Sequence, residues 1–214
     1  MIIELLFLIA KGIWMTAVVT ALSLVFGIVG GGALCMMKTS QSRVLPAIAT
    51  SCILIFRSVP PVLLLLFIFF GVKIGAFRFD PLSAAVVGLG LITAANMAET
   101  YRGALLSIHA GQWDAANALG ISRVYRFTDI IGPQLLRVSM PGMATYAIVL
   151  LKESSLASTI GVQEIAFHAS LVSKQTYLAL ETYLIAGLFY ILMSIAIAWI
   201  ARAAEVKMSR RVAR

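Results

Sequence analysis

The sequence has few charged residues, only two cysteines and none of the common motifs of soluble enzymes. Charged residues make up 12% of the 214 positions, whereas a soluble domain carries about a quarter. Cys35 and Cys52 both lie in apolar runs, away from any Cys-x-x-Cys or Cys/His cluster. They are therefore expected to be buried free thiols, and no metal site is predicted. A Gly-x-x-x-x-Gly-Lys phosphate loop, a Gly-x-Ser-x-Gly elbow and a His-Glu-x-x-His pair are all missing, so we expect neither ATP binding nor catalysis by this chain.

Hydrophobic residues dominate what remains, at 61% of the chain. A helix needs about 20 apolar residues to cross the hydrocarbon core of a bilayer. Five runs approach or exceed that length, at about 13–37, 45–72, 82–107, 135–151 and 183–203. The sequence therefore predicts an all-α polytopic membrane protein with five transmembrane helices in a single domain, residues 1–214. The second run contains Pro60-Pro61, which should kink or break it.

The net charge of +8 comes mostly from basic residues at the ends of the apolar runs. Most of the 17 lysines and arginines fall in the loop at 38–43, the loop at 102–137 and the C-terminal tail. Because cytoplasmic loops are enriched in lysine and arginine, this distribution predicts the N-terminus outside and the C-terminus inside. No basic patch with interleaved aromatics is present, so nucleic-acid binding is not expected.

A sixth span at 155–180 is the main rival to this topology. It would have to bury Glu164, His168 and Lys174, each at a cost of a few kcal/mol. It would also place the basic tail outside. We therefore expect this segment to be an extracytoplasmic or re-entrant loop with short helices.

One polar interruption stands out, at 112–120, with the sequence Gln-Trp-Asp-Ala-Ala-Asn-Ala-Leu-Gly. Asp114 near the start of a helix at 113–119 would favour its N-terminus, alanines favour the helix, and Gly120 would end it. Such a helix is too short to be stable by itself. From composition alone, it could be a helix that docks into a partner's groove or an ordinary amphipathic connector.

The spacing of this interruption, an acid followed by two alanines, then Gly120, Ile130 and Pro133, resembles the cytoplasmic loop signature of the membrane subunits of ABC importers. Three further segments, AETYRGAL at 98–105, LLKESSLASTIGV at 150–162 and FRSVP at 56–60, are similar to permease subunits of polar amino-acid ABC importers of the histidine/glutamine/arginine type. Asp114 stands where that family usually has Glu, and Gly132 where it has Leu. Ser58-Val59 replaces Gly-Thr and resembles the methionine-importer permeases.

The resemblance implies a type I ABC importer permease fold in the bacterial inner membrane, with a coupling helix in a cytoplasmic loop at about 109–134. Expected partners are two copies of a separate ATPase that holds ATP and Mg, a second permease subunit (identical or homologous), an extracytoplasmic solute-binding protein, an amino-acid substrate and membrane lipid. Residues expected to dock on the ATPase are Asp114, Ala115, Ala116, Leu119, Gly120 and Pro133.

Ionisable and polar residues within the predicted spans are candidates for a substrate pathway. Glu99, Asn96 and Thr93 lie on one helical stripe that could face a solute cavity; alternatively, Glu99 pairs with Arg102. Arg57, beside the Pro60 break, could meet a substrate carboxylate or satisfy exposed carbonyls. The polar residues that end the fourth predicted span, at 152–155, are also candidates. The predicted pathway residues are therefore Arg57, Asn96, Glu99, Lys152, Glu153, Ser154 and Ser155.

Two alternatives to a polar amino-acid importer remain at this point. One has the same architecture and carries methionine or another small solute. The other is an autonomous secondary transporter that uses Glu99 as a proton relay. Five spans without a detectable inverted repeat argue against the secondary transporter.

Overall fold

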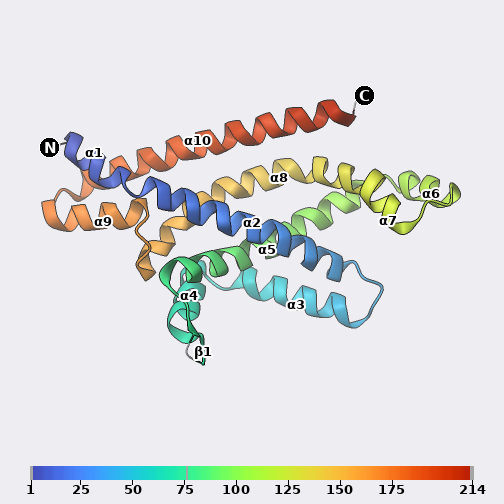
Figure 1. Cartoon of the computed structure of the whole chain (residues 1–214), viewed down its shortest axis with the longest axis horizontal. Coiled ribbons are helices and arrows are strands. Elements are labelled where there is room, and N and C mark those ends of the chain that lie inside the picture. The colour runs from blue at the N-terminus through green and yellow to red at the C-terminus, as the bar shows by residue number, and fades with distance from the viewer. Residues whose placement is uncertain (1, 76, 213–214) are drawn as a thin grey trace.

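The computed structural model describes residues 2–75 and 77–212, nearly all of them helical (Figure 1). The α-helices are α1 (Ile2–Ala10), α2 (Ile13–Lys38), α3 (Val44–Ser58), α4 (Pro61–Leu66), α5 (Pro81–Ser107), α6 (Ala110–Ala118), α7 (Arg123–Tyr125), α8 (Gly132–Glu153), α9 (Ile165–Thr176) and α10 (Ala179–Val212). Two π-helical segments, η1 (Phe67–Gly71) and η2 (Arg126–Ile131), and a 3-10 segment, η3 (Ser154–Ile160), continue some of them. The only strands in the described part are β1 (Lys73–Ile74) and β2 (Phe77–Arg78), a two-residue antiparallel ladder.

The described residues contain four to five candidate membrane spans, against the five predicted from the sequence. Within the described residues, four helical stretches are long and apolar enough to cross a bilayer: Ile2–Lys38, Pro81–Ser107, Arg123–Ile160 and Ala179–Lys207. The bent pair formed by Val44–Ser58 and Pro61–Gly71 makes a fifth if it is counted as one span.

The second predicted span is not a single straight crossing, because the chain bends by 106° between α3 and α4. Neither Pro60 nor Pro61 has a backbone N–H, and the residue before a proline is driven to an extended backbone. Val59 has that conformation, with ψ at 129°. The 15 residues of α3 rise about 22 Å, short of the roughly 30 Å hydrocarbon core. The segment α4–η1–β1 then projects sideways from the bundle (Figure 1).

The centre of the bundle is the parallel pair α2 and α5. Buried residues recur every three or four positions along α2 and include Ser23, Gly27, Gly31 and Cys35. Small residues let two backbones approach closely in a membrane, where lipid tails leave little hydrophobic drive for helix association. A Cβ added to Gly31 would lie 2.4 Å from the Cβ of Met97, so this contact requires glycine.

The segment between α8 and α10 contains no sixth span, because η3 and the 12-residue α9 are too short to cross. The reason given by the sequence was incomplete, since Glu164 is fully buried. Its carboxylate is satisfied by the Phe167 N–H at 2.8 Å and by the Tyr190 hydroxyl, which both donate to it. Burial nevertheless raises the pKa of the Glu164 carboxyl. An acid in this position thus holds the start of α9 against α10.

An apolar groove of about 410 Å³ lies between α2, α8 and α10, with Ala21, Ala147 and Ile197 among its lining residues. Many apolar side chains of α10 are exposed, including Leu184, which is 65% exposed. Exposed apolar side chains on a helix of this kind are what a bilayer accommodates.

We predict that Gly31→Val disrupts the α2–α5 contact, whereas Gly32→Val does not. A side chain at Gly31 would collide with Met97, but a Cβ on Gly32 would meet no atom within 4 Å beyond the adjoining backbone of its own helix. Overpacking of this kind costs about 1–3 kcal/mol. The measurement is the yield and thermal stability of the purified protein in detergent. Equal behaviour of the two variants would contradict the close packing described here.

Candidate functional site

The polar interruption forms a short helix, α6, at the end of the molecule opposite the N-terminus (Figure 1). It begins at Ala110 rather than at residue 113, because His109 Nδ1 accepts a hydrogen bond from the Gly111 N–H at 3.1 Å. Asp114 therefore lies in mid-helix, and the predicted carboxylate at the helix N-terminus is wrong. The predicted stop at Gly120 is confirmed: this residue has φ of 68°. The Ile121 N–H donates to the Ala116 carbonyl at 3.0 Å, as in a Schellman motif.

The two faces of α6 differ. Trp113, Ala116 and Asn117 share one face, on which Ala116 is only 1% exposed. The predicted docking residues Asp114, Ala115, Leu119, Gly120 and Pro133 are all exposed. Ala116 differs from the other predicted docking residues, because its side chain is buried within the chain.

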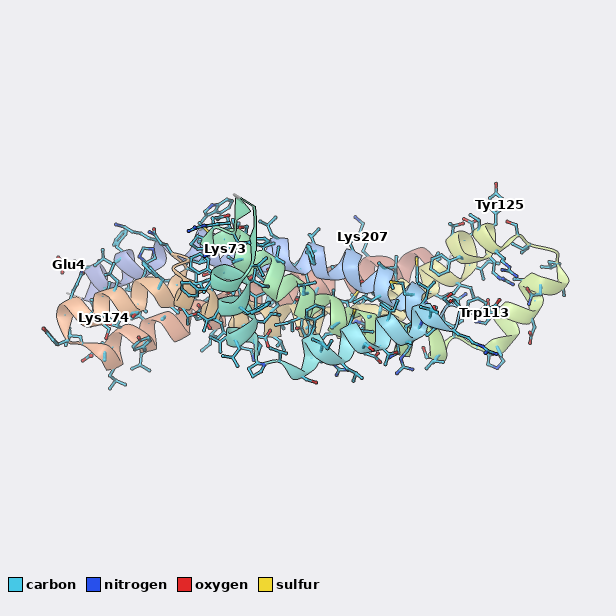
Figure 2. The ribbon with its side chains drawn as sticks, turned by 90° about the horizontal axis from the view of Figure 1, so that it is seen from below. Glu4, Lys73, Trp113, Tyr125, Lys174 and Lys207 are labelled. Carbon is cyan, nitrogen blue, oxygen red and sulfur yellow. The ribbon has the colours of Figure 1, made fainter. Side chains whose placement is uncertain are left out.

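Two residues that the sequence argument missed extend the exposed surface of this loop. Val124 and Tyr125 on α7 are 70% and 66% exposed. Figure 2 shows Trp113 and Tyr125 at the end of the molecule opposite Glu4 and Lys174. Large apolar side chains in a polar loop were the signal that could have identified them, since exposed apolar clusters commonly mark interaction sites.

A second polar region lies between α5 and α8. The Asn96 side-chain amide donates to the Tyr146 hydroxyl at 3.1 Å and to the Ile92 carbonyl at 2.9 Å. Thr93 is fully buried and donates to the Leu89 carbonyl at 2.7 Å. The sequence argument missed Tyr146, which looks like an ordinary aromatic residue of an apolar span. Its hydroxyl makes it the contact between the α5 stripe and α8.

Glu153, at the end of α8, has an unusual environment. Its Oε2 is buried and makes no hydrogen bond to any described residue. Tyr146 interacts electrostatically with both Glu153 and Arg57, and Arg57 is exposed at the end of α3, beside the helix break. Of the predicted pathway residues, Asn96 contacts Tyr146 directly, and Arg57 and Glu153 lie within electrostatic range of it.

The neighbours of Glu153 are arranged differently. Ser154 is fully buried and donates to the Leu151 carbonyl at 2.7 Å. Ser155 donates to the Lys152 carbonyl, also at 2.7 Å. Both hydroxyls therefore satisfy backbone acceptors where the α-helix gives way to η3. Lys152 is exposed.

Glu99 lies one helical turn beyond Asn96 on α5 and takes part in an ion-pair cluster. Lys38 Nζ lies 2.5 Å from Oε1 of Glu99, and Arg102 Nε lies 2.9 Å from Oε2. The pair with Arg102 is one of the two alternatives that the sequence offers for Glu99. The contact with Lys38 is not one of them, because it joins residues far apart in the sequence and depends on how α2 packs on α5.

Comparison with known proteins shows which family the chain matches. Residues 23–210 match the family model described as "Binding-protein-dependent transport system inner membrane component". The chain is 33% identical over 180 residues to the probable amino-acid ABC transporter permease protein YckA of Bacillus subtilis, which covers 84% of this chain and 80% of that protein. It is 32% identical over 201 residues to the arginine transport system permease protein ArtQ of the same organism, with 94% and 92% covered.

A solved structure supports the fold directly. The crystal structure of an amino acid ABC transporter with histidines contains a chain that superposes with a TM-score of 0.84 at 28% identity, and the match covers 94% of both chains. The expected fold of a type I importer permease is confirmed.

We predict that Glu99→Gln lowers stability, because it leaves the cations of Lys38 and Arg102 facing each other without a counter-charge. The partly exposed setting limits the expected loss to about 1 kcal/mol. Combining Glu99→Gln with Lys38→Gln should recover part of it. The measurement is the thermal stability of the purified protein for the wild type, both single variants and the double variant. An unchanged stability of Glu99→Gln together with lost activity would instead favour a direct role in the pathway.

Proposed function

The chain belongs to the family of binding-protein-dependent transport system inner membrane components, and from this membership we propose that it is the permease subunit of an ABC importer for a polar amino acid. It is a multi-pass protein of the bacterial inner membrane. The observation that carries the proposal is the short helix α6 at one end of the helical bundle, whose exposed residues include Gly111, Ala115 and Ala118. The named activities of the relatives, amino-acid and arginine transport, support the substrate class.

The partners follow from this role. A second permease subunit completes the pathway, two ATPase subunits bind the loops that carry α6, and an extracytoplasmic solute-binding protein delivers the substrate. ATP and Mg are held by the ATPase, and this chain supplies no catalytic residue. The basic residues Arg123, Arg126 and Arg137 near α6 favour a cytoplasmic position for that loop, with the N-terminus outside and the C-terminus inside.

The connections of α6 suggest how ATPase movement reaches the pathway. Helix α5 ends at Ser107, just before α6, and α8 follows it through α7 and η2. The same two helices carry the Asn96–Tyr146 contact. A displacement of α6 by the ATPase therefore acts on both sides of the polar region at once. We expect this coupling to alternate the access of that region between the two sides of the membrane.

The substrate site proposed here is centred on Tyr146. An amino acid needs an acceptor for its ammonium group and a cation for its carboxylate. The Oε2 of Glu153, to which no described residue donates, suits the ammonium, since a buried acceptor without a donor is costly until a ligand supplies one. Arg57 suits the carboxylate, and Asn96 and Tyr146 offer further hydrogen bonds. Lys152 lies beside Glu153 and is the second available cation.

Two other functions differ from this one in their transport properties. A methionine or small-solute importer would need the same partners but would not be inhibited by polar amino acids. A secondary transporter would work without an ATPase. Uptake into proteoliposomes that contain the permease, with and without the ATPase and binding protein, distinguishes all three when arginine, histidine, glutamine and methionine are compared.

We predict that Ala115→Arg prevents docking of the ATPase without harming the fold. Ala115 is exposed on the smooth side of α6, so a long cation there should obstruct any groove that receives the helix. The matched control is Gln41→Arg, which adds the same charge in the exposed loop between α2 and α3. Co-purification of the ATPase and ATP-dependent uptake are the measurements. Normal co-purification and uptake with Ala115→Arg would reject docking at this face.

We predict that Glu153→Gln lowers uptake about tenfold to a hundredfold, since a hydrogen bond to a charged group contributes roughly 1.5–3 kcal/mol. The substitution preserves shape, so yield and basal ATP hydrolysis should persist. Glu181→Gln is the control, because Glu181 is an exposed acid in the first turn of α10. Full uptake by Glu153→Gln would remove this residue from the pathway.

A further inference from the structure

An arginine from the segment that follows α6 contacts the face of this helix that carries Trp113 and Asn117. Arg126 is the first residue of η2, and its guanidinium carbon lies 5.7 Å from the centre of the Trp113 ring, within the range of a cation–π contact. Its Nη1 donates a hydrogen bond to Oδ1 of Asn117. Trp113 and Asn117 are four residues apart and therefore lie on the same face of the helix.

We propose that Arg126 is a positioning residue that holds α6 in the orientation required for docking. The proposal rests on the proposed binding of the ATPase at α6 and adds a residue that acts before the ATPase arrives. Arg126 does not belong to the docking surface itself, because it contacts the face opposite Ala115 and Ala118.

The helix needs such support for physical reasons. Nine residues are too few for a helix that is stable by itself in water. Packing contributes little, because Ala116 is the only buried residue of α6. One further side-chain contact, from the Gln134 amide to Gln112 Oε1 at 3.3 Å, links the start of α6 to α8. Arg126 instead contacts the middle and the last turn of the helix.

The local backbone directs Arg126 toward α6. Ser122 Oγ accepts from the Tyr125 N–H at 3.4 Å and so starts α7. The π-helical segment η2 then inserts a wider turn before α8, which changes the direction of the preceding side chains relative to that helix. In this turn the Gly132 N–H donates to the Phe127 carbonyl, and a Cβ on Gly132 would lie 2.6 Å from that oxygen. Gly132 thus suits the π-helical turn.

The test measures separately whether Arg126 stabilises α6 and whether that stabilisation affects docking of the ATPase. The variants are Arg126→Gln, Arg126→Lys and Asn117→Ala, and the control is Arg123→Gln, an exposed arginine on α7. Hydrogen exchange of the α6 amides is measured first on the purified permease without the ATPase. We expect Arg126→Gln to accelerate exchange about tenfold, Arg126→Lys and Asn117→Ala to do so less, and Arg123→Gln to leave it unchanged.

Binding of the purified cognate ATPase to the same variants is measured second, without nucleotide. We expect its affinity to fall about tenfold in Arg126→Gln and to change little in Arg123→Gln. Asn117→Ala should add little in the Arg126→Gln background, because the two groups act on each other.

The outcomes are distinct. Unchanged α6 exchange in Arg126→Gln overturns the proposal, as does an equal effect of Arg123→Gln. Faster exchange with unaltered ATPase affinity leaves the support by Arg126 in place and rejects docking at α6. Should Arg126→Gln fail to fold, Arg126→Lys and Asn117→Ala give the same decision, and unaltered exchange in both overturns the proposal.

Discussion

The close packing of α2 on α5 is the contact on which the remaining arrangement depends. Gly27 and Gly31 of α2 lie against Thr93 and Met97 of α5, so the two backbones approach more closely than larger side chains would permit. Helix association in a bilayer relies on such packing and on interhelical polar contacts. The fixed position of α5 then places Asn96 beside Tyr146 of α8. The positions of the α6 loop and of the polar region between α5 and α8 therefore depend on this helix pair.

The same helix pair connects the two ends of the protein. At one end, Glu99 joins α5 to Lys38 of α2 through an ion pair. Beyond Ser107, the chain passes almost directly into α6, and it returns through η2 into α8. The Pro60 break removes α4 from this unit and leaves α3 as a short helix beside it. The connection from α5 to α6 is therefore short, because α5 ends at Ser107 and α6 begins at Ala110.

The sequence predicted the features that depend on local composition. Apolar length identified the spans, Pro60-Pro61 identified the break, and Gly120 identified the end of α6. Periodicity assigned residues to a common helix face, but it could not say which neighbour that face meets. The contact of Lys38 with Glu99, the role of Tyr146 and the inward direction of Ala116 all depend on how separate segments pack. Burial of Glu164 is similar, since its hydrogen-bond donors lie on two different helices.

The acids within the spans illustrate why composition alone cannot assign function. The free-energy cost of placing a charge in a membrane does not distinguish Glu99 from Glu153, because each is an ionisable group in an apolar helix. Their partners distinguish them. Glu99 has a cation on each oxygen, so an additional cationic ligand would have to displace Lys38 or Arg102. Among the described residues, no donor reaches the buried Oε2 of Glu153, and a ligand's ammonium group would satisfy it at no such cost. Unused hydrogen-bonding capacity, and not charge by itself, is what makes Glu153 the better candidate for substrate binding.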